Sequence, residues 1–192
     1  MNAMNTATFL SQLQQQAQAQ KSLVQSEFLT LDQLELNFKL HATGWSILEC
    51  LEHLNRYSRF YLPHVEQAIS SAPASLTPQP VCYSWVGKKS LDVANPNGVK
   101  KHKTLKHMNP HNSQLTSEVL EEFLQHQNTL LQLLEAAAKV DVNKKAIPIE
   151  FFRLLKMRIG EALEFLVMHQ QRHLQQALRV KNQILQPISL VV

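Results

Sequence analysis

Glycine and cysteine are scarce in this sequence of 192 residues, which holds 4 glycines, 8 prolines and 2 cysteines. Neither a C-x-x-C pair nor a disulfide framework is present, which excludes a small disulfide-stabilised domain. Few glycines and prolines, together with long stretches rich in Leu, Gln, Glu and Ala, predict a mainly helical protein. The length suits one sizeable core and is short for two, so we expect a single all-α domain over residues 1–192.

Long hydrophobic runs are also missing. No apolar stretch approaches the roughly 20 residues that a membrane-spanning helix needs. Residues 1–11 lack the basic region and apolar run of a secretory signal. The two cysteines, Cys50 and Cys82, fit a reducing compartment. These absences predict a soluble, cytoplasmic protein without a membrane partner.

The net charge of +4 is small, but the lysines are unevenly distributed. One segment contains a single acid, Asp92, and six lysines, namely Lys88, Lys89, Lys100, Lys101, Lys103 and Lys106. Such a segment suits nucleic acid or an anionic small molecule, and it equally suits a solvated loop. No known nucleic-acid motif accompanies it, and only Tyr83 and Trp85 supply aromatic rings nearby. Nucleic acid therefore ranks last among the partners that we expect.

Apolar residues that recur every three to four positions predict four long helices. The first helix covers residues 6–27, and the second covers residues 45–70. The third helix has Thr116 or Ser117 as its N-cap, with Glu121 or Glu122 in its first turn. The fourth helix begins near Ile149 or Arg158 and ends at Ile184. Pro63 lies inside the second helix and predicts a kink near Tyr61.

The connections between these helices differ greatly in length. Residues 30–43 and 140–149 are short, and the second includes a stretch, Ala146–Pro148, that is predicted to be extended. Residues 72 to about 115 contain prolines, asparagines and lysines without clear periodicity, and a connection this long is usually functional or a crossover. We therefore predict a four-helix bundle with a long crossover between helices two and three, which run parallel.

Two histidines four residues apart, His169 and His173, lie on the apolar stripe of the fourth helix. This spacing places both imidazoles on one side of the helix, where they can bind the same metal ion. The other members of the stripe are Ile159, Ala162, Leu163, Leu166, Ala177 and Val180. Buried imidazoles need partners for their ring nitrogens, which a metal ion and hydrogen bonds supply. A pair of hydrogen-bonded core histidines is the alternative.

The spacing alone is weak support for a metal site, because His107 and His111 share it across a proline that disfavours a helix. A metal ion needs at least one more protein ligand, and the best candidate is His53 in the second helix. Cys50, three residues earlier, is expected to be packed in the core rather than bound to metal. His64 is a more distant candidate. The remaining histidines are predicted to be loop or surface residues; they are His41, His102, His107, His111 and His126.

The segments around these histidines resemble the signatures of a known family. Residues 45–54, WSILECLEHL, resemble the W-S-x6-H-L signature of the DinB-like (damage-inducible) superfamily. Residues 169–176, HQQRHLQQ, resemble its H-x3-H-x2-Q signature. Four further segments resemble those of an uncharacterised subgroup of DinB-like proteins: Tyr61-Leu62-Pro63, Ser84-Trp85-Val86-Gly87, Lys103-Thr104-Leu105 and Asn109-Pro110. The similarity spans about residues 44–180.

The resemblance implies a bundle in up-down-down-up order and a divalent metal ion bound by three histidines, which fall on His53, His169 and His173. Zn²⁺ and Ni²⁺ both suit neutral imidazole. Members of the family often form homodimers. Those with assigned activities resemble transferases or isomerases that use a low-molecular-weight thiol, such as bacillithiol or mycothiol.

Two functions follow from these expectations. The first is a metal-dependent enzyme that activates a thiol for S-transfer to an electrophilic small molecule, or water for hydrolysis. Glu49, Glu52 and Arg172 are expected to orient ligands or substrate, and the lysine-rich segment to receive an anionic thiol. The second is a non-enzymatic stress-response binding module whose metal site is structural or vestigial.

Overall fold

The computed structural model describes residues 4–75, 77–98 and 104–184. This part of the chain forms six α-helices, a short 3-10 helix and a two-stranded sheet. In chain order they are α1 (Thr6–Glu27), α2 (Gln33–Asn37), α3 (Ile47–Ser70), α4 (Trp85–Ala94), η1 (Lys106–Met108), α5 (Glu118–Ala137), β1 (Lys145–Ile149), β2 (Phe152–Arg158) and α6 (Ile159–Ile184). The prediction of a mainly helical chain is confirmed.

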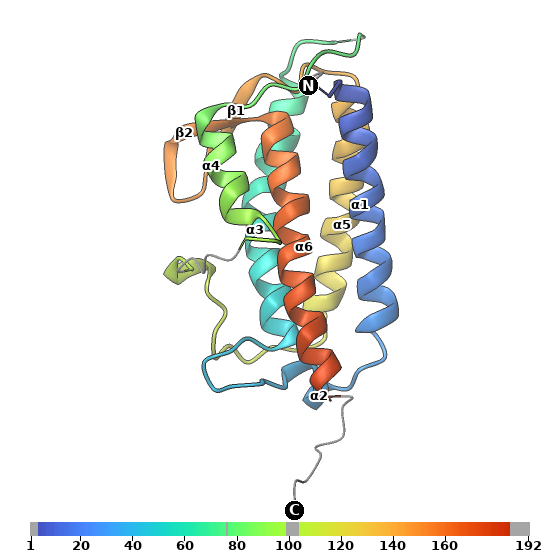
Figure 1. The fold of residues 1–192 in the computed structure, drawn as a ribbon, viewed down its shortest axis with the longest axis vertical. Helices are drawn as coiled ribbons and strands as arrows, with labels where there is room; N and C mark the ends of the chain where they lie inside the picture. The colour runs from blue at the N-terminus through green and yellow to red at the C-terminus, as the bar shows by residue number, and fades with distance from the viewer. Residues whose placement is uncertain (1–3, 76, 99–103, 185–192) are drawn as a thin grey trace, which may run out of the picture.

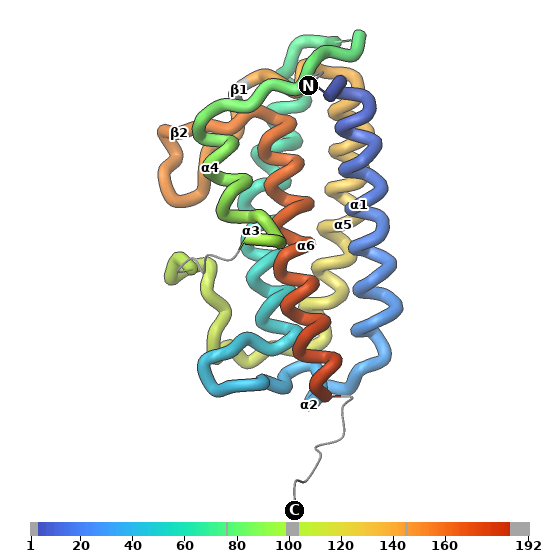
Figure 2. Tube along the Cα trace, viewed as in Figure 1, coloured from blue at the N-terminus to red at the C-terminus, as the bar shows by residue number. Residues whose placement is uncertain are grey.

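Four long helices, α1, α3, α5 and α6, lie side by side along the long axis of the molecule (Figure 1). α3 packs against α5 and α6, and α1 packs against the same two helices. α1 and α6 run away from the end that holds the N-terminus, whereas α3 and α5 run toward it (Figure 2). Two clusters of buried apolar side chains fill the space between the helices. Side chains of α3 and α6 that face each other can therefore meet inside the molecule.

The start of α3 is fixed by a capping box. Ser46 Oγ accepts a hydrogen bond from the backbone N of Glu49 (3.1 Å), and Glu49 Oε2 accepts one from the backbone N of Ser46 (2.9 Å). Glu49 Oε1 accepts hydrogen bonds from Lys39 Nζ and from the backbone N of Asn112, both at 2.7 Å. The Glu49 carboxylate, expected to orient ligands or substrate, thus connects the beginning of α3 to two neighbouring loops. α3 then continues as one helix through Pro63, and the kink near Tyr61 stays a prediction.

The long connection after α3 contains more regular structure than the sequence predicts. α4 packs against α6, and its N-cap Ser84 accepts a hydrogen bond from the backbone N of Gly87 (3.0 Å). Lys88 and Lys89 therefore lie on an exposed helix face rather than in a loop, and the prediction of an aperiodic segment is wrong here. Ten residues offer fewer than three helical turns, too few for a clear periodic pattern. Lys100, Lys101 and Lys103 lie outside the described residues.

Two other element boundaries also differ from the prediction. Residues 145–158 form a hairpin in which β1 pairs antiparallel with β2, with Pro148 opposite Lys156. The fourth helix therefore begins at Ile159, so a start near Ile149 is wrong and a start near Arg158 is almost right. Short apolar runs fit a strand as well as a buried helix, which explains the ambiguity.

The first connection contains α2, a single short helix capped by Asp32. Among the described helices, none combines the length and apolar character needed to cross a bilayer.

α4 approaches α6 so closely that a glycine is required at the contact. A Cβ atom on Gly87 would overlap the carboxylate of Glu161. That carboxylate is buried and accepts hydrogen bonds from the backbone N of Arg158 (2.7 Å), from Ser84 Oγ (2.9 Å) and from the backbone N of Ser84. One acidic side chain therefore fixes the start of α4 and the start of α6 together.

We expect Gly87→Ala to lower the free energy of unfolding by about 2–4 kcal/mol, because the displaced carboxylate loses hydrogen bonds to a charged acceptor. Urea unfolding followed by circular dichroism measures the change. Lys89→Ala, on the exposed face of the same helix, is the matched control and should stay within about 0.5 kcal/mol of the wild type. Equal stabilities of the two variants would contradict the close contact.

Candidate metal centre

Three histidines from two neighbouring helices meet inside the molecule. His53 comes from α3, and His169 and His173 come from α6. One ring nitrogen of each residue lies within 4.8 Å of those of the other two. The ring centroids are 4.5 to 5.0 Å apart. His53 and His169 are buried and His173 is half-buried. The structure therefore brings together the helical pair and the separate third histidine that the sequence singles out.

Hydrogen bonds define the orientation of two of these rings. His53 Nδ1 lies 2.7 Å from the carbonyl oxygen of Met108. His173 Nδ1 lies 3.1 Å from Oε1 of Gln176. Because both oxygens can only accept, each Nδ1 carries the proton and each Nε2 is left with a free lone pair. Metal-binding histidines commonly have such a hydrogen bond on the nitrogen that does not bind the metal.

The spacing between two of the ring nitrogens fits a single metal ion. Nε2 of His53 and Nε2 of His169 are 3.3 Å apart. Two nitrogens bound to one tetrahedral ion at about 2.0–2.1 Å would lie about 3.3–3.4 Å from each other. Nδ1 of His169 is buried and has no hydrogen-bond partner among the described residues, whereas Nε2 of His169 lies at hydrogen-bonding distance from Nε2 of His53. The donor set, three imidazoles with converging nitrogens, therefore suits a divalent ion.

Aromatic side chains pack against the three imidazoles. The ring of Trp45 lies 4.8 Å from that of His53 and 5.5 Å from that of His173, measured between centroids. The ring of Tyr57 lies 5.0 Å from that of His53 and 4.5 Å from that of His169. These contacts exclude water from the sides of the rings and lower the local dielectric. The cost of charging any of the imidazoles rises accordingly.

Burial keeps the three imidazoles neutral. Desolvation lowers the pKa of His53 to about 4 and the pKa of His173 to about 3. The pKa of His169 is lowered well below 6.5, first by desolvation and then by its two histidine neighbours, which disfavour additional positive charge. Neutral imidazole is the form that donates a lone pair to a metal ion. At neutral pH the three side chains are therefore ready to bind a metal without first losing a proton.

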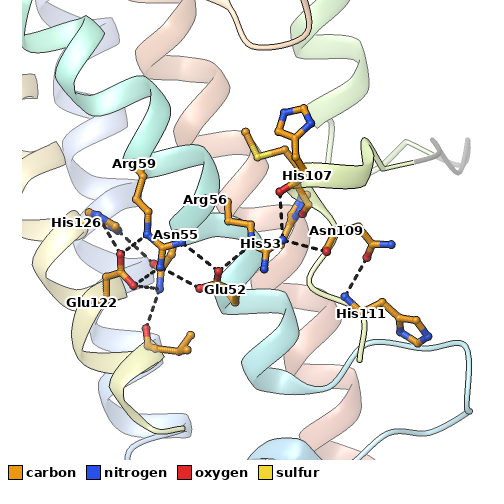
Figure 3. Close-up of polar contacts among 12 residues, drawn as sticks. Glu52, His53, Asn55, Arg56, Arg59, His107, Asn109, His111, Glu122 and His126 are labelled. Atoms are coloured by element: carbon orange, nitrogen blue, oxygen red, sulfur yellow. Dashed lines mark hydrogen bonds and ion pairs between the residues drawn. The ribbon is translucent and has the colours of Figure 1, made fainter. Parts of the chain in front are cut away.

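A loop crosses α3 beside the site, and α3 binds its backbone (Figure 3). We call residues 105–112 the strap. Arg56 Nη1 donates hydrogen bonds to the carbonyls of His107 (3.1 Å) and Asn109 (3.0 Å). The carbonyl between them is the one that accepts from His53. Arg56 therefore positions the group that fixes the orientation of a candidate ligand.

We expect Arg56→Ala to weaken the affinity of the site for Zn²⁺ by about tenfold, as is typical for residues that orient a metal ligand. Competition with a chelator of known affinity measures the change. The matched control is Arg59→Ala, because Arg59 also donates to Glu52 (3.1 Å) but otherwise to Glu122 on α5. If Arg59→Ala lost as much affinity for Zn²⁺ as Arg56→Ala, the hydrogen bonds from Arg56 to the strap would have no specific role in metal binding.

The polar residues expected to orient ligands or substrate have other partners. Glu52 accepts hydrogen bonds from Arg56 (2.8 Å) and Arg59 (3.1 Å), and Arg56 in turn binds the strap. Arg172 Nη1 donates to the carbonyl of Asn95 (2.5 Å) and so connects α6 to the end of α4. Cys50 is fully buried, and burial raises the pKa of its thiol, in keeping with the expectation that it is packed in the core.

The other described histidines lie outside the cluster, and His41 among them is exposed, as predicted. His64 Nδ1 lies 2.7 Å from the Phe60 carbonyl, His107 pairs with Glu150, His111 Nδ1 lies 3.9 Å from Glu49 Oε1, and His126 Nδ1 lies 3.3 Å from Asn55 Oδ1. His107 and His111 share no helix, in agreement with the proline between them. His126 is half-buried in α5, which the sequence pattern did not indicate. His102 lies outside the described residues.

Comparison with known proteins gives two matches. The sequence model of the DinB superfamily matches residues 14–177, a range that includes all three histidines. A protein of Bacillus subtilis (strain 168) named "Uncharacterized protein YuaE" is 24% identical over 159 residues, which cover 83% of this chain and 91% of that protein. No solved structure matches the chain.

Proposed function

The chain belongs to the DinB superfamily, and from this premise we propose that it is a metal-dependent enzyme whose divalent ion is bound by His53, His169 and His173. The observation that carries the proposal is the cluster of three buried or half-buried neutral imidazoles, two of which have Nε2 atoms 3.3 Å apart. The proposal includes one domain with four main helices in up-down-down-up order, in which the segment after α3 is the crossover.

Zn²⁺ and Ni²⁺ are the proposed metals, because both bind neutral imidazole well. Three protein ligands leave at least one coordination position for water, a thiol or a substrate, as is typical of catalytic sites. Cys50 and Cys82 stay outside the proposed ligand set. A cytoplasmic location, where thiols stay reduced, agrees with two free cysteines.

The proposed reaction is S-transfer from a low-molecular-weight thiol to an electrophilic small molecule, or else hydrolysis. A bound divalent ion lowers the pKa of a water or thiol that reaches it and so supplies a nucleophile at neutral pH. The chain's own residues contribute position and environment. Met108 and Gln176 orient two imidazoles through Nδ1, and the Trp45 and Tyr57 rings exclude bulk water and offer an apolar surface. We also propose that the protein acts as a homodimer.

A structural metal site in a non-enzymatic stress-response module is the second candidate. The near-complete burial of His53 and His169 favours it, because structural ions are usually enclosed by protein. The half-buried His173 favours the enzyme, since its side of the cluster is the one that solvent reaches.

Metal analysis of purified protein tests the site itself. We expect one equivalent of divalent metal in the wild type and none in His53→Ala or His169→Ala. His126→Ala removes a half-buried histidine outside the cluster and should retain the metal. Equal metal content in all four proteins would sink the proposal.

A second assay separates the two candidate functions. Metal-loaded protein is incubated with a panel of low-molecular-weight thiols and electrophiles, with and without a chelator. Turnover that a chelator abolishes and that His169→Ala lacks supports the enzyme. Full metal occupancy without turnover for any thiol, and without hydrolysis of any ester or amide tested, supports the structural site instead.

A further inference from the structure

The outer side of α4 and of the hairpin exposes several large apolar side chains. Trp85, Phe151, Phe152 and Leu154 are 69%, 68%, 48% and 82% exposed. α4 and β2 contact each other, and the hairpin projects from the side of the bundle (Figure 1). Large apolar groups that stand together on a surface usually mark an interaction site.

Four basic side chains lie on the same two elements, α4 and β2, and one of them, Arg153, also lies over the ring of Phe60 (5.8 Å from its centroid). They are Lys88, Lys89, Arg153 and Lys156, all exposed. Within the described part of the chain, none of the four forms an ion pair. Asp92 is the only exposed acid on α4, and the Glu150 side chain in the hairpin turn is buried and pairs with His107. We call the four apolar and four basic residues the hairpin patch; it has a clear excess of positive charge.

We propose that the hairpin patch binds the surface of an anionic membrane. The apolar side chains of the hairpin would enter the boundary between headgroups and acyl chains, and the basic side chains would lie at the level of the lipid phosphates. Such binding needs no helix that crosses the bilayer. It departs from the expectation of no membrane partner and is independent of the proposed enzymatic function.

The shape of the patch favours a lipid surface over other anionic partners. Its most exposed side chain, Leu154, lies on β2 in the hairpin that projects from the bundle. The aromatic members of the patch could stack on nucleobases, but its most exposed member, Leu154, is aliphatic and could not, whereas a bilayer accepts both kinds of side chain. A bilayer accepts protruding apolar groups without a matching cavity.

The charge of the patch argues against a second copy of the chain as its occupant. A twofold-symmetric contact places the same surface of both copies together. Lys88, Lys89, Arg153 and Lys156 would then face a second set of the same four cations, with only Asp92 to offset each set. Like charges brought together in this way oppose association. The proposed homodimer would therefore use another surface.

Flotation of the full chain with lipid vesicles tests the proposal. We expect binding to vesicles of phosphatidylcholine and phosphatidylserine, little binding to phosphatidylcholine alone, and loss of binding at high salt. Lys88→Ala/Lys89→Ala should weaken binding at least about tenfold, since each basic residue near an anionic surface contributes about fivefold. Lys139→Ala, an exposed lysine on the loop after α5, is the charge control.

Leu154→Ser tests the apolar part of the patch and should also weaken binding. Its matched control is Leu34→Ser, because Leu34 is 83% exposed and lies on α2 at the other end of the molecule. Equal binding to neutral and anionic vesicles, or no binding to either, overturns the proposal. Substitutions in the hairpin patch that leave vesicle binding unchanged overturn the proposal too. If these substitutions instead change the molar mass measured by sedimentation equilibrium, the occupant of the patch is a second copy of the chain. If they weaken oligonucleotide binding, the occupant is nucleic acid.

Discussion

Replacing His169 by alanine should lower the affinity of the protein for Zn²⁺ by more than about 100-fold. His169 presents Nε2 at 3.3 Å from that of His53, and it lies within the three-nitrogen cluster. Loss of a residue that only orients a metal ligand typically costs 10–100-fold in affinity, so loss of a ligand costs more. Competition between metal-free protein and a chelator of known affinity gives the number directly.

The control for this substitution is His126→Ala, which removes an imidazole from α5 outside the cluster. The affinity of His126→Ala for Zn²⁺ should stay within about twofold of that of the wild type. Circular dichroism of both variants without metal verifies that the helices remain. A His169→Ala protein that is folded and binds Zn²⁺ as tightly as His126→Ala would exclude His169 as a ligand.

Acidification should destabilise the metal-free protein strongly. The pKa values of His53, His169 and His173 are all lowered in the folded chain, whereas an unfolded histidine titrates near 6.5. Below pH 6.5 the unfolded chain therefore binds more protons than the folded chain, and stability falls as the pH falls. Each histidine contributes up to about 1.4 kcal/mol per pH unit in this range, so we expect a loss of about 3–4 kcal/mol between pH 7.5 and 5.5.

Urea unfolding of metal-free protein at the two pH values measures this loss. His173→Gln keeps a polar side chain of similar size and should reduce the loss by about 1.4 kcal/mol, because one of the titrating groups with a lowered pKa is gone. If the imidazoles were solvated and had the pKa of an unfolded histidine, the wild type would be equally stable at pH 7.5 and pH 5.5. Equal stabilities at the two pH values would therefore contradict the burial of these imidazoles.

The long helices and the histidine cluster were accessible from the sequence because their signals repeat. The bounds predicted for the first helix are those of α1, since a helix of six turns presents its apolar stripe many times. His169 and His173 stand on a stripe whose other members are buried, so the face they share follows from the pattern. That His53 lies opposite them depends on how α3 packs on α6. Here the resemblance to the DinB-like signatures supplied what periodicity cannot.

The groups that orient the site were harder to predict. The Met108 carbonyl that accepts from His53 belongs to the backbone, so the residue type at that position carries no signal for it. Gln176 was visible as part of the H-x3-H-x2-Q signature, although its contact with His173 was not. The role of Glu49 could have been read from the sequence, because Ser46 three residues earlier completes a capping-box pattern.

X-ray absorption spectroscopy of the zinc-loaded protein tests the central claim most directly, because it identifies the atoms bound to the metal. The three-histidine site predicts three imidazole nitrogens at about 2.0–2.1 Å from the metal, with at most a water or added ligand besides. A shell that contains sulfur at about 2.3 Å, from Cys50 or Cys82, or one without imidazole, would contradict it.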